Sequence, residues 1–61
     1  MEMDTQDYLK KALLDTQERV RDFMMYAKQV DNKGLQKFFS EYATSEAYQA
    51  QKLQELLEYR Q

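Results

Sequence analysis

The stretch that decides the fold is Val30-Asp31-Asn32-Lys33-Gly34-Leu35. It holds the only cluster of turn-forming residues in a chain of 61 residues that contains one Gly and no Pro. On both sides of this stretch, apolar residues recur in steps of three and four, which is typical of a helix that packs along one seam. We therefore predict two antiparallel helices, at about 5–30 and about 33–58, joined by a turn at about 31–33.

Seven positions form the expected seam of each helix. They are Leu9, Leu13, Thr16, Val20, Phe23, Ala27 and Val30 in the first helix, and Leu35, Phe39, Tyr42, Glu46, Gln49, Leu53 and Leu56 in the second. Folding the chain at the turn sets these positions level in pairs. Phe23 lies beside Tyr42, Val20 beside Glu46, and Thr16 beside Gln49. The seam is apolar except for Thr16, Glu46 and Gln49, which we expect to form a buried polar layer.

The apolar stripe is wider than one hairpin can cover. Further apolar residues flank the seam: Ala12, Met24, Tyr26, Phe38, Ala43, Ala50, Leu57 and Tyr59. A small pair of helices buries only one face of each, and oligomerisation is the usual remedy. We expect an all-α hairpin, one domain over 1–61, that dimerises into a four-helix bundle with the apolar seam residues in the dimer core.

Composition excludes several classes of function. The chain has no Cys and no His, which removes disulfides, thiolate metal sites and Cys or His catalysis. Its formal net charge of −2 argues against a nucleic-acid or anionic-membrane surface. No apolar run is long enough to span a bilayer, and the first residues do not resemble a signal peptide, so a cytoplasmic protein is expected. The charges around Arg19 and Arg21 alternate with acids and indicate a solvated face.

Three motifs carry a resemblance to a known family. They are Phe23-x-x-Tyr26-Ala27, then Gly34-Leu35-x-x-Phe38-Phe39-x-Glu41-x-Ala43, and finally Glu46-x-x-Gln49-Ala50-x-x-Leu53. Together they resemble one helical hairpin of the ferritin-like, rubrerythrin-type superfamily. The chain is also similar in length and pattern to short hairpin proteins of spore-forming bacteria.

The ferritin-like resemblance implies a site for two iron or manganese ions, held by a Glu on one helix and a Glu-x-x-His on the next. In this chain Glu46 matches the Glu of that pair, Gln49 replaces its His, and Thr16 stands where the first-helix Glu belongs. Two interpretations of the polar layer follow. The favoured one is a hydrogen-bonded layer without metal, because ligand number and geometry are lacking. In the other, Glu46 residues of a dimer hold a divalent cation such as Mn, Fe, Mg or Ca, assisted by Gln49.

The sequence favours a small non-enzymatic structural or protein-interaction module: a homodimeric ferritin-like bundle without a complete di-metal site, without a catalytic residue and without a cofactor. A divalent-metal-binding protein is the first alternative. An RNA-binding hairpin dimer is the second, and it would need a basic stripe, whereas the lysines are interspersed with acids. The expected partners are a second copy of the chain and an unidentified protein, with no nucleic acid and no membrane.

Overall fold

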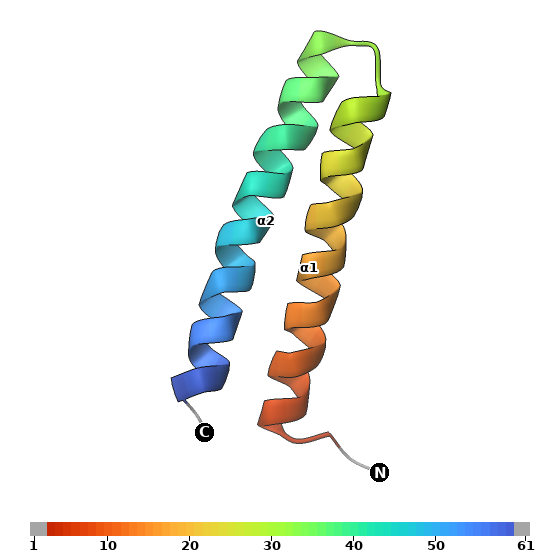
Figure 1. Ribbon diagram of the computed structural model, residues 1–61. Helices are drawn as coiled ribbons and strands as arrows, with labels where there is room; N and C mark the ends of the chain where they lie inside the picture. Colours follow the sequence, from red (N-terminus) through yellow and green to blue (C-terminus); the bar gives the residue numbers. More distant parts are fainter. Residues whose placement is uncertain (1–2, 60–61) are drawn as a thin grey trace.

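The computed structural model describes residues 3–59 and forms a hairpin of two α-helices. Helix α1 (Thr5–Gln29) and helix α2 (Lys33–Tyr59) run antiparallel beside each other, and the short connection leaves the start of α1 near the end of α2 (Figure 1). The predicted all-α hairpin is confirmed, and each helix ends within one residue of the expected position. Within the described residues, neither helix is long and apolar enough to cross a membrane.

Side-chain caps fix where each helix starts. The Asp4 carboxylate accepts from the backbone N–H of Asp7 at 2.9 Å, and the Asp7 carboxylate accepts from the Asp4 N–H at 3.3 Å. This reciprocal pair satisfies N–H groups that have no partner inside a helix. At the turn, the Asn32 side-chain oxygen accepts from the Leu35 N–H at 3.0 Å. Asn32 therefore caps α2.

The turn consists of residues 30–32, because Val30 is already extended. Its φ of −82° and ψ of 147° end α1, while its N–H still donates to the Tyr26 carbonyl. Gly34 lies in the first turn of α2 and has no positive φ. A Cβ added at Gly34 would lie 3.1 Å from the capping oxygen of Asn32. The glycine thus makes room for the cap.

The face of α1 that packs on α2 is the predicted one. All seven expected seam positions of α1 and the turn, from Leu9 to Val30, are buried or half-buried. On α2, however, Leu35, Tyr42, Gln49 and Leu56 are exposed. The positions of α2 that are buried or half-buried are instead Gln36, Phe39, Ala43, Glu46, Ala50, Leu53 and Leu57.

Helix α2 is therefore rotated about its axis from the predicted orientation, so that at four of the seven positions the next residue along the chain faces α1. Two neighbouring stripes of α2 share Phe39, Glu46 and Leu53, and the helix presents the stripe that also carries Ala43 and Ala50. Small side chains let two helices approach closely, whereas Tyr42 and Gln49 would hold them apart. Steric fit decides between two stripes of similar apolar content.

The core that results is thin. Among residues 3–59, only Leu13, Thr16, Ala43 and Leu57 are buried, and no large side chain is fully buried. The radius of gyration is 14.2 Å, compared with about 10.5 Å for a compact globule of this length. The hairpin alone leaves much of its apolar surface in water.

Candidate interaction surface

The polar layer joins two residues of α1 to one of α2. The hydroxyl of Thr16, whose residue is 4% exposed, donates to the Ala12 carbonyl at 2.7 Å and accepts from Nη2 of Arg19 at 3.3 Å. Nε of Arg19 donates to Oε1 of Glu46 at 2.5 Å. The Glu46 side chain is 18% exposed, so this ion pair lies at the edge of the helix interface. Among the described residues, no buried side-chain nitrogen or oxygen atom lacks a hydrogen-bond partner.

Arg19 is the residue that sequence reasoning missed. The alternating charges around it indicated a solvated face, yet its guanidinium bridges the two helices. The hydrogen bond to Glu46 raises the pKa of Arg19 above its ordinary value, and the negative charge of Glu46 adds to this shift. The sequence contains one signal for this contact, because Arg19 precedes Val20 and Val20 is predicted to lie level with Glu46.

Gln49 does not belong to the layer, which corrects the prediction. Its side chain is exposed because the rotation of α2 turns position 49 away from α1 and brings position 50 inward. Thr16 therefore finds its partner in Arg19. Glu46 is occupied by the same guanidinium, and within residues 3–59 no three acidic, His or Cys side chains lie close enough together to hold a metal ion.

Aromatic rings fill the interface near the turn. Phe23 stacks on Tyr42 with ring centroids 4.2 Å apart and an interplanar angle of 19°. It also meets Phe39 edge-on at 5.6 Å and Tyr26 at 5.3 Å. The stack confirms that Phe23 and Tyr42 lie level, as predicted. The predicted position of the two helices along their axes is thus correct, even though α2 is rotated about its own axis.

The cluster continues outward into an exposed apolar surface on one side of the hairpin. We call it the aromatic face, and it comprises Tyr26, Leu35, Phe38, Tyr42 and Leu56. All five are exposed, Phe38 at 55%. Phe38 adjoins the rings of Phe39 and Tyr42 at centroid distances of 5.8 and 6.2 Å. Leu56 lies on the same side of α2 as Phe38 but about 20 Å farther along the helix than Tyr42. Several large apolar side chains exposed on one side of a molecule are typical of an interaction site.

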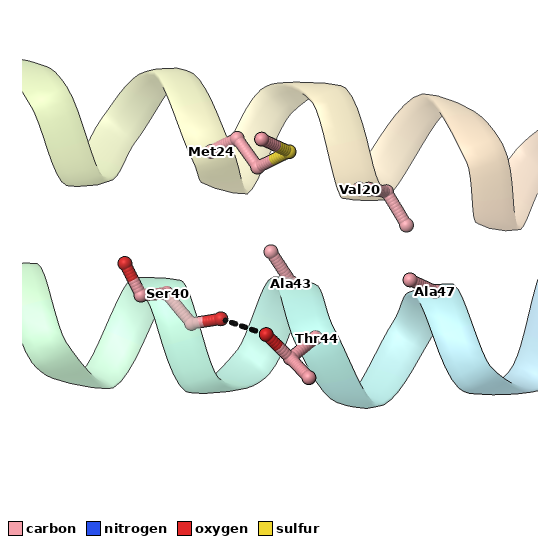
Figure 2. A pocket seen from close by; sticks show the side chains of 6 residues that line it. All are labelled: Val20, Met24, Ser40, Ala43, Thr44 and Ala47. Carbon is pink, nitrogen blue, oxygen red and sulfur yellow. Dashed lines mark hydrogen bonds between the residues drawn. The ribbon is translucent and has the colours of Figure 1, made fainter.

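A groove lies between the helices next to Val20 and Met24 of α1. Its other wall is made of small residues of α2, which are Ser40, Ala43, Thr44 and Ala47 (Figure 2). The groove has a volume of about 210 Å³ and is open to solvent. The Thr44 hydroxyl donates to the Ser40 carbonyl at 3.0 Å, so it is satisfied within α2. Position 43 lies on the opposite edge of the α2 seam from position 42, so the groove is on the other side of the hairpin from the aromatic face.

No family model, curated protein or solved structure matches this chain. The ferritin-like resemblance therefore stays a prediction that depends on the three sequence motifs.

Proposed function

We propose that this chain is a non-enzymatic assembly or protein-interaction module that works as a homodimeric four-helix bundle. The observation that carries the proposal is the aromatic face, a set of five exposed large apolar side chains on one side of the hairpin. A second hairpin packed on this face would move those side chains out of water. Burial of apolar surface stabilises by about 25 cal/mol per Å².

The thin core supports the same proposal. Four buried residues are few for a domain that must offset the conformational entropy of 57 described residues. Obligate homodimers often have no stable folded monomer, so their folding and association occur together. The dimer would keep the ferritin-like architecture, with Arg19 in place of a metal ion as the partner of Glu46. Thr16 in turn accepts a hydrogen bond from Arg19.

The test is Phe38→Glu, with Tyr48→Glu as its matched control. The two aromatic residues are similarly exposed in the hairpin, at 55% and 57%. Helical spacing places Tyr48 on the strip of Glu41 and Glu55, away from the aromatic face. Each substitution puts the same charge on the same helix.

We expect sedimentation equilibrium to give a dimer for the unmodified chain and for Tyr48→Glu. Phe38→Glu should sediment as a monomer at the same concentration, because a C2 interface would bury two like charges. Its melting temperature should also lose the concentration dependence that an associating protein has. A stable, concentration-independent monomer of the unmodified chain would refute the proposal, as would equal association of the two variants.

A further inference from the structure

The groove on the side of the hairpin opposite the aromatic face is mostly apolar. Its floor and walls are aliphatic or small, since Val20 and Met24 face Ala43 and Ala47 across it (Figure 2). Cavities of about 150 Å³ accommodate a ring the size of benzene. A groove of about 210 Å³ therefore has room for one large apolar side chain supplied from outside.

Basic residues flank the groove on its α1 side. Arg21, Met24 and Lys28 are spaced at i, i+3 and i+7, so they share one strip of α1. Met24 lines the groove, and the two cations therefore stand on either side of it along the helix. The acid Glu18 precedes Arg21 by three residues and adjoins it on the side farther from Met24, and Asp15 and Asp22 lie farther round α1.

Basic residues also flank the groove on its α2 side, towards the turn. Lys33, Lys37, Ser40 and Thr44 follow one another at three- and four-residue steps and share one strip of α2. Ser40 and Thr44 line the groove. Glu41 follows Lys37 by four residues and adjoins it on the side farther from the groove.

Four cations, Arg21, Lys28, Lys33 and Lys37, thus frame the groove, and we call them the basic rim. In the part of the chain that the structure describes, ion pairs engage Lys11, Arg19 and Lys52, and none involves a residue of the basic rim. The rim is basic although the whole chain has a net charge of −2. Three of the lysines that are interspersed with acids in the sequence, Lys28, Lys33 and Lys37, therefore lie on the groove side of the hairpin.

We propose that this groove binds an acidic amphipathic helix of another protein. A helix lying in a groove inserts an apolar side chain at every third or fourth position. Acidic residues beside those anchors would face the basic rim, which gives orientation and fast association. A second copy of this chain fits poorly, because a C2 contact through the groove would bring the basic rim against itself. The proposal is independent of the homodimer, which uses the opposite side.

The experiment uses a synthetic helical peptide with Leu at i, i+4 and i+7 and Glu on both flanks of that stripe. A control peptide carries Lys in place of every Glu. Amide chemical shifts of the isotope-labelled full chain map the contact, and fluorescence anisotropy gives the affinity. We expect shifts at Val20, Met24 and Ala47, and binding at least about tenfold tighter for the acidic peptide.

Two variants separate the groove from the rim. Ala47→Leu fills the groove from an exposed position with a good helix former, and Arg21→Glu with Lys37→Glu reverses half of the rim. Each should weaken binding by about tenfold or more. The matched controls are Ser45→Leu and Lys52→Glu on other strips of α2, and neither should change the affinity. Circular dichroism and sedimentation of all variants show whether the fold and the homodimer persist.

Several outcomes would overturn the proposal. Equal affinity for the acidic and basic peptides would remove the role of the rim, and shifts confined to the aromatic face would place binding elsewhere. Vesicles containing phosphatidylserine and single-stranded poly(U) form two further arms. The surface recognises phosphates and not a helix if three results are found together. Vesicles or poly(U) bind through the rim, Ala47→Leu leaves that binding unchanged, and the peptide does not bind.

Discussion

The Phe23–Tyr42 stack and the Arg19–Glu46 ion pair lie one helical turn apart on both helices. They hold the helices together through different kinds of interaction. The stack brings two rings to 4.2 Å inside an aromatic cluster. The ion pair lies at the interface edge, with side chains that are 47% and 18% exposed. Water screens such a pair, whereas the rings gain both from burial and from stacking. The stack should therefore contribute more to the free energy of unfolding than the ion pair does.

The largest effect that this comparison predicts is for Phe23→Ala. Phe23 contacts three other rings, so its loss should lower the free energy of unfolding by about 3 kcal/mol, the low end for Phe→Ala because the site is only half-buried. Urea denaturation followed by circular dichroism measures it. The control, Met25→Ala at a half-exposed position, should stay within about 0.5 kcal/mol. Similar losses for the two variants would show that the aromatic cluster does not hold the turn end together.

The second prediction tests the rotation of α2, which decides which residues meet the polar layer. Ala50 is half-buried against α1, so Ala50→Leu should overpack the interface and cost about 1–3 kcal/mol in thermal or urea unfolding. Gln49→Leu adds the same side chain one position earlier, where position 49 is exposed. It should change stability by less than about 0.5 kcal/mol. The opposite ranking would restore the seam predicted from the sequence.

These two contacts also show what the sequence could and could not predict. The steps of three and four, the single glycine and the capping side chains determine the hairpin and its alignment, so the Phe23–Tyr42 contact was predictable. The rotation of α2 was not, because the stripe with Tyr42 and the stripe with Ala43 are both consistent with the pattern. Only the packing of side chains against α1 distinguishes them. Because periodicity alone does not distinguish the two stripes, it places Gln49 in the polar layer, whereas packing turns Ala50 towards α1 instead.

Arg19 was missed for a different reason. A long cationic side chain can start on a solvated strip and still reach an acid on the neighbouring helix, because its methylene stem packs along the surface. The helical period predicts the direction of the Cα–Cβ bond, but it does not predict the position of a guanidinium group at the end of a long side chain. The groove and the basic rim could not be predicted for a related reason. Both depend on which strips of the two helices face the same side, and only the packed hairpin shows that.

The smallest predicted effect concerns the ion pair itself. A double-mutant cycle with Arg19→Ala and Glu46→Ala should give a favourable coupling well below the loss caused by Phe23→Ala, because both side chains are partly in water. The coupling should shrink as salt rises from roughly 0.05 to roughly 1 M, where the screening length falls to about 3 Å. It should not fall with mild alkali. The pKa of Arg19 is raised, so its contribution is complete below the ordinary pKa of arginine and is lost only above it.

The matched control for this cycle is the Lys11–Asp15 pair within α1, whose atoms are 3.0 Å apart and whose side chains are 66% and 48% exposed. Its coupling should be smaller than that of Arg19 and Glu46, since Glu46 is better shielded from water. A coupling that salt leaves unchanged would contradict the edge position of the Arg19–Glu46 pair. A coupling as large as the Phe23→Ala loss would reverse the comparison and make the polar layer the main link between the helices.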